Sequence, residues 1–335
     1  MTHLDHLRKL LITEPRGYPC QNVDFILPPT DPRAAFGFVI GEQAKVYPLM
    51  SGHNTICVAT VLLESNLVPM QYPVTKFLLE APGGLVEITA QCESEKATKI
   101  KILNVPAFVH ALNLQVTGVP SAGVGSPSLP PITVDLAYGG MHYCVVDAAQ
   151  PALGGLPLVP SNGKRICRLG EMIKTRCREQ HPVNHPSPDL HYPGCDILVF
   201  RSENTTQPGA SARNAVVMSN GGLDWENEGT WSAMLDRSPC GTGTCAVMAV
   251  LHAKQQLGLG EDFVHESIVG SLFTGRLLEE KVVWAGGEGG SAGDSRVVGV
   301  QPTVEGQAWI TQHCKVVLHE TDPFPAGFTV SDIWA

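Results

Sequence analysis

Short apolar segments recur along most of the chain, and each is bounded by Gly, Pro, Asn or Asp. They are rich in Val and Ile and have the length of single strands, which is typical of half-buried β-strands. The predicted strands are 36–40, 84–91, 98–105, 132–138, 142–147, 196–200 and 215–219. The pattern therefore predicts a protein that consists mainly of β-sheet.

Two segments break this pattern and predict helices of an unusual kind. They are 51–64 (SGHNTICVATVLLE) and 240–257 (CGTGTCAVMAVLHAKQQL). Residues 56–63 and 245–251 carry no polar stripe beyond a threonine, and a helix that is apolar all round is a buried helix. Two buried helices among many strands predict two β-structures, each wrapped around one helix.

Stretches rich in Gly, Pro and Ser mark the connections between these elements. Residues 118–131 (GVPSAGVGSPSLPP) predict a linker or a long loop, 286–293 (GGEGGSAG) a hairpin tip, and 180–191 a surface loop. At 335 residues the chain is longer than one hydrophobic core usually fills, so two domains are expected.

Composition narrows the class of protein. Hydrophobic residues make up 43% and charged residues 16%, which excludes intrinsic disorder. The formal net charge of −9 gives no basic surface for nucleic acid or anionic lipid, and no run approaches the roughly 20 apolar residues that span a bilayer. The ten cysteines are scattered and no signal peptide precedes them, so we expect a soluble cytoplasmic protein with reduced thiols.

The two predicted helices begin alike, with SGHNT at 51–55 and CGTGT at 240–244. Unpaired backbone N–H groups at a helix start, among small residues, form a site for an anion. Two such sites that face each other would hold one small carboxylate substrate, with Ser51 and Cys240 on opposite faces of it.

Cys240 has the clearest chemical setting of the ten cysteines. The helix dipole favours a thiolate at a helix N-terminus, which predicts a pKa below the reference of about 8.5 and a general base near neutral pH. The alternative is an inert buried cysteine, but Pro239 before it and Gly241 after it place it at the helix start. Cys57 and Cys245 are expected to pack within the buried helices.

The start of the second helix also admits a dinucleotide site. The spacing of Gly241, Gly243 and Ala246 matches the dinucleotide-binding fingerprint. Glu261 would supply its acidic residue, but the preceding segment SAMLDRSPC is not a buried parallel strand.

Histidines allow two further kinds of site. Four residues have loose zinc-ligand spacing within a proline-broken loop: His181, His185, His191 and Cys195. Solvated loop histidines are the alternative for this group. A nucleophile for acyl transfer would pair Cys240 with His53 or His252, but His252 lies far from the helix start and no hydrolase signature surrounds His53.

The segment around Cys240 resembles a known family. Residues 236–244 (DRSPCGTGT) are similar to the second active-site motif of the proline racemase family, which includes 4-hydroxyproline 2-epimerases and trans-3-hydroxyproline dehydratases. Residues 50–53 (MSGH) align with its first motif, normally Met-Cys-Gly-His. Further matches over nearly the whole chain are NVPAF (104–108), VDLAYGG (134–140), ARN (212–214), FVHESIVGSLFTGR (263–276), PTVEGQAWIT (302–311) and DPFPAGF (322–328).

The resemblance implies a diaminopimelate-epimerase-like α+β fold with two pseudo-symmetric β-rich domains, each wrapped around a central buried helix. We place the N-terminal domain at residues 1–130, completed by 317–335, and the C-terminal domain at 131–316. The resemblance also implies that hydroxyproline is the small-molecule substrate and that neither a metal nor an organic cofactor is used. It leaves both a monomer and a homodimer open.

The resemblance assigns roles to individual residues as well. In the family, two residues flank the substrate Cα: one removes the α-proton and, in epimerases, the other delivers a proton to the opposite face. By position this acid/base pair is Ser51 and Cys240. The carboxylate would be held by Gly52, His53, Gly241 and Thr242, and the ring nitrogen by Asp236. A helix-capping or solvated aspartate is the alternative for Asp236.

Position 51 departs from the family pattern. It is serine where racemases and epimerases usually have cysteine, whereas dehydratases usually keep the first cysteine and have threonine at the second position. Serine can donate a proton but is scarcely available as an alkoxide near pH 7, and dehydration needs no donor on the opposite face. We therefore expect dehydration of trans-3-hydroxy-L-proline, with some 2-epimerisation of trans-4-hydroxy-L-proline.

Two further short segments bear on this choice. EPRG at 14–17 resembles the dehydratase branch, while SPCGTGT at 238–244 is the epimerase form. A dedicated 4-hydroxyproline 2-epimerase is thus the close alternative, and a non-catalytic amino-acid-binding protein is the alternative from another class.

Residues 223–234 (LDWENEGTWSAM) form a longer connection than usual, in which Trp225 and Trp231 either cover the cleft or pin a surface hairpin.

Overall fold

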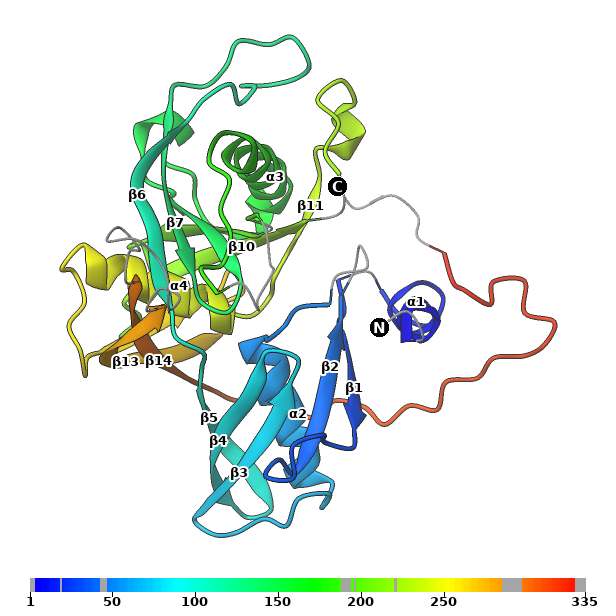
Figure 1. Ribbon diagram of the computed structural model, residues 1–335. Coiled ribbons are helices and arrows are strands. Elements are labelled where there is room, and N and C mark those ends of the chain that lie inside the picture. The colour runs from blue at the N-terminus through cyan, green and yellow to red at the C-terminus, as the bar shows by residue number, and fades with distance from the viewer. Residues whose placement is uncertain are drawn as a thin grey trace, which may run out of the picture. The chain divides into compact units, whose positions relative to one another are not determined.

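The computed structural model separates into two compact units (Figure 1). It describes residues 4–18, 20–42, 47–187, 194–195, 197–219, 222–284 and 297–328. One unit comprises Met1–Ile102 with Gly306–Ala335, and the other comprises Leu103–Glu305. The chain thus divides after residues 102 and 305. The boundaries expected from the sequence were after residues 130 and 316. Residues 118–131 lie inside the second unit, where they connect two paired strands.

The first unit contains a five-stranded run of sheet in the order β1-β2-β3-β4-β5. Its strands are β1 (Val23–Leu27), β2 (Phe36–Gly41), β3 (Val74–Ala81), β4 (Gly84–Glu93) and β5 (Lys96–Leu103). Pairing is antiparallel for β1–β2 and β3–β4 and parallel for β2–β3. Two helices accompany this sheet, α1 (Asp5–Ile12) and α2 (Gly52–Glu64).

Helix α2 is not buried on all sides as the sequence predicted. Ile56 and Leu62 are buried, but Cys57 is exposed and Val61 is 37% exposed. These two positions lie one turn apart, so they form an uncovered stripe. The stripe consists of a small thiol and a valine, so no polar residue in the sequence indicates it.

The C-terminal segment of the chain belongs to the first unit and contacts its start. Glu14 and Phe328 exchange backbone hydrogen bonds of 3.0 and 2.9 Å. Arg16 forms an ion pair with Asp322. The EPRG and DPFPAGF segments, at opposite ends of the sequence, are therefore joined in the fold.

The second unit contains a longer sheet, in the order β14-β13-β12-β10-β9-β8-β7-β6, with β11 paired to β10. Its strands are β6 (Phe108–Val116), β7 (Ile132–Tyr138), β8 (His142–Asp147), β9 (Ile197–Ser202), β10 (Ala212–Ser219), β11 (Ala233–Leu235), β12 (Asp262–Glu266), β13 (Leu272–Trp284) and β14 (Val297–Gly306). Pairing is parallel for β8–β9 and β10–β12. Its helices are α3 (Gly163–Gln180) and α4 (Gly241–Ala253), with short 3-10 turns at Pro151–Leu153, Pro160–Asn162 and Glu228–Thr230.

Helix α4 confirms the prediction of a helix buried all round, because every residue from 241 to 251 is buried. It packs against β6, β7, β8 and β13. The sequence did not lead us to α3, which packs on β9 and β10. Its buried positions Ile166, Leu169, Ile173 and Cys177 nevertheless have the spacing of one helix face.

The predicted strands lie on strands of the structure, as 36–40 does on β2 and 142–147 on β8. The predicted hairpin tip at 286–293 lies outside the described residues, as does the 188–191 part of the predicted loop. Within the described part of the chain, no helix has both the length and the apolar character to cross a membrane.

Candidate active site

Cys240 lies at the start of α4, where the chain turns out of β11. It is the N-cap residue, with φ 62° and ψ 113°, and it is 7% exposed. The backbone N–H of Gly243 donates a hydrogen bond to its Sγ at 3.4 Å. Gly243 permits this approach, since a Cβ there would lie 3.0 Å from the sulfur. The thiol is therefore aimed at the first turn of the helix.

Two hydroxyl groups complete the surroundings of this sulfur. Tyr143 Oη lies 3.2 Å from Cys240 Sγ, and Thr242 Oγ1 lies 3.9 Å from it. The two hydroxyls are also 2.6 Å apart. Tyr143 is completely buried on β8. No local sequence pattern assigns it a role, because its contact with Cys240 spans 97 positions of the chain.

The predicted lowering of the Cys240 pKa is wrong. Burial, and after it the charge of Asp236, raise the pKa of this thiol to about 12. The hydrogen bonds from Tyr143, Gly243 and Thr242 oppose this change. Desolvation of a thiolate outweighs the half-charge at the end of the helix, because Cys240 is only 7% exposed.

A pair of glycines brings the β7–β8 hairpin against the start of α4. A Cβ on Gly139 would lie 2.2 Å from the backbone O of Thr242, and one on Gly140 would lie 2.7 Å from Thr242 Cγ2. Asn104 Nδ2 donates to the backbone O of Gly139 at 2.7 Å. Two motifs far apart in sequence, NVPAF and VDLAYGG, thus determine the position of one wall of the site.

Ser51 is the N-cap residue of α2 in the first unit, and it is 7% exposed. Its hydroxyl makes no capping hydrogen bond to the helix backbone. Instead, Oγ accepts a hydrogen bond from Asn54 Nδ2 at 3.0 Å. An amide that donates to the hydroxyl oxygen directs the hydroxyl proton elsewhere, so this geometry suits a proton donor.

Asp24 on β1 is an ionisable group that interacts with His53 at the start of α2. Burial raises the pKa of its carboxyl to about 6, and the charge of His53 acts in the opposite direction. Its Oδ1 is buried and has no hydrogen-bond partner among the described residues. The sequence had led us to His53 but not to Asp24, since an aspartate in a short predicted strand carries no signal of its own.

The predicted site residues thus form two groups, one at the start of each N-capped helix. Ser51, Gly52 and His53 begin α2 in the first unit, and Asp236, Cys240, Gly241 and Thr242 surround the start of α4 in the second unit. Asp236 Oδ1 accepts the backbone N–H of Ser238 at 2.8 Å, so it also shapes the turn before Cys240. Each group can present helix N–H groups to a carboxylate.

Comparison with protein families decides the identity of the fold. The family model described as proline racemase matches residues 1–329. The chain belongs to the proline racemase family. Its α+β fold with β-rich units is the diaminopimelate-epimerase-like fold that the resemblance implied.

Two solved structures support this membership in detail. A probable proline racemase from Agrobacterium radiobacter K84, with bound carbonate, is 33% identical at a TM-score of 0.80, and the match covers 98% of this chain and 86% of that chain. A hydroxyproline epimerase from Agrobacterium vitis, with bound trans-4-hydroxy-L-proline, is 35% identical at a TM-score of 0.78, with 98% and 84% covered. A PhzF-family phenazine biosynthesis protein from Bacillus anthracis, 10% identical at a TM-score of 0.51, shares the fold alone.

The structure of this proline racemase family member excludes the dinucleotide interpretation. The strand before α4 is β11, which pairs antiparallel to β10 rather than parallel as the fingerprint requires. Glu261 accepts the backbone N–H of Gly258 at 2.9 Å beyond the far end of α4, so it is not aimed at the helix start.

In the predicted zinc group, His181 and His185 make unrelated contacts, and His191 lies outside the described residues. His181 Nε2 lies 3.0 Å from the backbone O of Gln115, while His185 packs its ring on Tyr138. No cluster of three metal-binding side chains occurs in the part of the chain that the structure describes. His252, the other proposed partner of Cys240, lies in the last turn of α4 with Nδ1 2.9 Å from the backbone O of Leu257.

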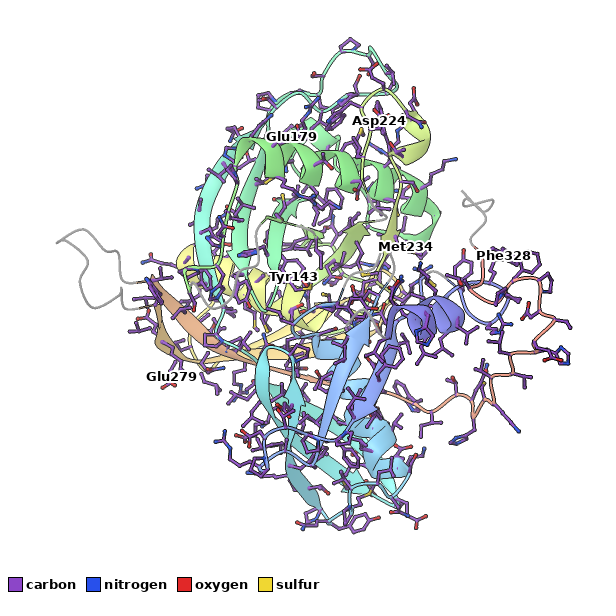
Figure 2. The ribbon with its side chains drawn as sticks, turned by 45° about the vertical axis from the view of Figure 1, so that its right-hand side comes forward. Tyr143, Glu179, Asp224, Met234, Glu279 and Phe328 are labelled. Carbon is purple, nitrogen blue, oxygen red and sulfur yellow. The ribbon has the colours of Figure 1, made fainter. Side chains whose placement is uncertain are left out.

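The long connection before β11 packs against α3. The guanidinium of Arg176 lies 3.7 Å from the ring centre of Trp225, and Trp225 Nε1 donates to Glu179 at 3.1 Å. Figure 2 shows Glu179 and Asp224 together at one end of the unit, away from Tyr143. This arrangement is the aromatic-pinned surface hairpin, one of the two interpretations that the sequence allowed.

Proposed function

We propose that this family member is a cofactor-independent enzyme that acts at Cα of hydroxyproline, with dehydration of trans-3-hydroxy-L-proline as its leading activity. The observation that supports this most is the setting of Cys240. Its sulfur lies at a helix N-terminus, and three groups that can donate a hydrogen bond, from Gly243, Tyr143 and Thr242, lie within 3.9 Å of it. Such donors stabilise a thiolate once it forms.

Cys240 would remove the α-proton. Its pKa of about 12 makes it a thiol near neutral pH, and part of that increase comes from Asp236. In the proposal Asp236 binds the ammonium of the substrate ring, and the helix starts with His53 and Thr242 bind the carboxylate. The ammonium would cancel the charge of Asp236, so binding of substrate itself would lower the pKa of the base.

Ser51 would act as the acid of the pair. Its oxygen already accepts from Asn54, so its proton is directed outward. In dehydration, the Cα–H and C3–O bonds break, a Cα–C3 double bond forms, and the hydroxyl leaves as water with a donated proton. The enamine then tautomerises to pyrroline-2-carboxylate. A serine suffices here because no alkoxide is needed as a base.

The second candidate is 2-epimerisation of trans-4-hydroxy-L-proline to cis-4-hydroxy-D-proline. It is favoured by the Agrobacterium vitis epimerase, which is 35% identical and binds trans-4-hydroxy-L-proline. Epimerisation requires Ser51 to protonate Cα from the face opposite to Cys240. The same two residues therefore serve both candidates, and the difference lies in how well the hydroxyl reprotonates carbon.

Incubation of the protein with each hydroxyproline in D₂O, followed by NMR, tests the proposal. We expect loss of trans-3-hydroxy-L-proline with formation of pyrroline-2-carboxylate. Slower entry of deuterium at Cα of the 4-hydroxy substrate, with inversion, would indicate epimerisation. Cys240→Ala should abolish both reactions, whereas ligand binding without any exchange in the parent protein would identify a binding protein and contradict the proposal.

A further inference from the structure

The backbone at Cys240 has a conformation that amino acids with a side chain rarely adopt. Its φ of 62° is in the left-handed region, and its ψ of 113° lies beyond the usual left-handed well. Such a conformation persists only where neighbouring groups hold it in place, and it is concentrated at functional sites. The contacts that hold it therefore have a direct effect on where the sulfur points.

The peptide unit between Pro239 and Cys240 is held at both polar ends. The carbonyl oxygen of Pro239 accepts from Asn214 Nδ2 at 2.6 Å and from Thr244 Oγ1 at 3.2 Å. On the other side, the N–H of Cys240 donates to Ser238 Oγ at 3.0 Å. Rotation about the N–Cα bond of Cys240 is limited by these contacts, because the peptide plane cannot turn without breaking them.

His265 lies behind this peptide and orients the amide of Asn214, which has one N–H for the Pro239 oxygen and one for the ring. The Nδ1 of His265 is 3.1 Å from Asn214 Nδ2 and 2.9 Å from Thr244 Oγ1. The single hydroxyl proton of Thr244 can go to only one of its two acceptors, the Pro239 oxygen or Nδ1. The amide of Asn214 donates to this nitrogen, so Nδ1 is the acceptor and the ring proton is on Nε2. Burial lowers the pKa of His265 to about 3, which keeps the ring neutral. A charged ring would be unable to accept the amide hydrogen bond.

This arrangement leaves polar atoms without partners. Asn214 Oδ1 and His265 Nε2 are buried, and neither has a hydrogen-bond partner among the described residues. Both side chains are completely buried. Unsatisfied buried polar atoms are costly, so a group selected for stability alone would be apolar or fully satisfied. The observation indicates a role in holding the turn rather than in stabilising the core.

The sheet brings the two residues together. Asn214 is on β10 and His265 on β12, which pair in parallel with Ala212 opposite His265. The neighbouring pair on these strands, Arg213 and Glu266, forms an ion pair with 3.6 Å between Nε and Oε1. The ARN and FVHES segments therefore meet directly beneath the turn that carries Cys240.

We infer that Asn214 and His265 are positioning residues, which hold the Pro239–Cys240 peptide so that the thiol points at the first turn of α4. The inference rests on the proposed role of Cys240 as the base. Neither residue touches the thiol, and each acts through the carbonyl of Pro239 or through its partner in the pair. Displacement of a reacting group by about 1 Å can cost about 10²-fold in rate.

A matched pair of variants tests the role of His265. In His265→Asn, the amide oxygen takes the place of Nδ1 as acceptor. In His265→Leu, the side chain has about the size of histidine but contains no acceptor. We expect kcat to fall about 10²-fold in His265→Leu with little change in substrate affinity, and His265→Asn to recover at least about tenfold of that loss. Equal kcat in the two variants, or losses that only follow their melting temperatures, would overturn the inference.

Variants at the other two positions keep the test valid if His265→Leu does not fold. Asn214→Asp removes the donor to Pro239 at constant size, and Thr244→Val removes the hydroxyl at constant size. The Asn214 contact is 2.6 Å and the Thr244 contact 3.2 Å, so the larger fall in kcat is expected for Asn214→Asp. The reverse order would contradict the inference.

The rate at which iodoacetamide alkylates Cys240, followed by mass spectrometry of its peptide, gives a readout that does not require turnover. We expect the wild type and His265→Asn to share one pH profile and His265→Leu and Asn214→Asp to depart from it. If the wild type consumes no hydroxyproline but this order holds, the proposed function fails and the positioning role stands. If turnover is present but the four profiles coincide, the positioning role fails.

Discussion

The carboxylate of Asp236 has two effects that oppose each other. It would bind the substrate ammonium, but its charge also raises the pKa of Cys240 and so hinders ionisation of the thiol. Asp236→Asn should therefore change two measurements in opposite directions. The pKa of Cys240 should fall, and each unit of that fall should speed alkylation at pH 8 by about three- to fourfold, because the thiolate fraction rises about tenfold while its nucleophilicity decreases. Turnover of hydroxyproline should decrease, since the ring nitrogen loses its charged partner.

The matched control for this prediction is Asp147→Asn, at an exposed aspartate of the same unit. It should leave both the alkylation rate and the turnover unchanged. A variant at Asp236 that is alkylated more slowly than the wild type would show that the carboxylate does not act on the thiol through its charge.

The hydroxyl of Ser51 limits the reaction in a different way. Ser51→Cys should raise the rate of 2-epimerisation of trans-4-hydroxy-L-proline about tenfold, because a thiol is the stronger acid and its thiolate can also act as a base from that face. Deuterium incorporation at Cα measures this rate. Ser65→Cys, at the exposed C-cap of the same helix, is the control and should have no effect. A slower Ser51→Cys enzyme would indicate another role for the hydroxyl.

Asp24 makes the stability of the first unit depend on pH. Its pKa rises from 3.8 to about 6 on folding, so the folded state binds a proton that the unfolded chain releases. The associated stability is present below pH 3.8 and is lost as pH rises through about 6. Asp24→Asn should thus raise the free energy of unfolding at pH 8 by up to about 3 kcal/mol, and the gain should shrink towards zero at pH 4.

Urea unfolding at the two pH values measures this effect. Asp31→Asn is a control of opposite sign, because Arg33 lowers the pKa of that carboxyl to about 2. A gain at pH 8 with a loss of turnover would show that Asp24 serves the site at the expense of stability. An unchanged unfolding curve at both pH values would contradict the burial of its charge.

At the scale of elements, the close approach of the β7–β8 hairpin to α4 is the most sensitive contact. Gly139→Ala would place a methyl group 2.2 Å from the carbonyl of Thr242. We expect a loss of about 1–3 kcal/mol in unfolding free energy and a fall in turnover, since the first turn of α4 must shift. Gly222→Ala, with nothing within 4 Å of its Cβ, is the matched control. Wild-type turnover in Gly139→Ala would show that the hairpin does not position the helix start.

Some elements were predictable from local pattern and others were not. Helix α4 could be predicted because its residues from 241 to 251 are apolar or small, and this is a local property. Helix α3 was missed, because charged residues interrupt its apolar face. The exposed stripe on α2 was missed for the opposite reason, since Cys57 and Val61 look like core residues in the sequence.

The candidate site shows the same division. Ser51 and Cys240 were predictable because the first residue of a helix has a recognisable sequence around it. Tyr143, Asn214 and His265 reach the turn at Cys240 only through the pairing of strands. The family matches ARN and FVHES contain Asn214 and His265, but a local match does not reveal what these side chains contact. The direction of the Cys240 pKa was mispredicted, because burial depends on the whole fold whereas the helix dipole can be inferred from a local sequence.

At the scale of the whole molecule, segments far apart in sequence converge in each unit. In the second unit, NVPAF, VDLAYGG, ARN and FVHES all contribute contacts around the start of α4. In the first unit, EPRG and DPFPAGF contact each other at opposite ends of the chain. The long-range matches to the family therefore have a physical basis in these contacts.

The discontinuity of the first unit has a consequence for biogenesis. The chain leaves this unit after residue 102 and returns to it at residue 306. Domains fold as units while the ribosome adds residues from the N-terminus onward. The unit with the cysteine is continuous, so it can fold as soon as its own residues have emerged. The unit with the serine is completed only when the residues from 306 onward have emerged, so we expect it to reach its final fold after the other unit.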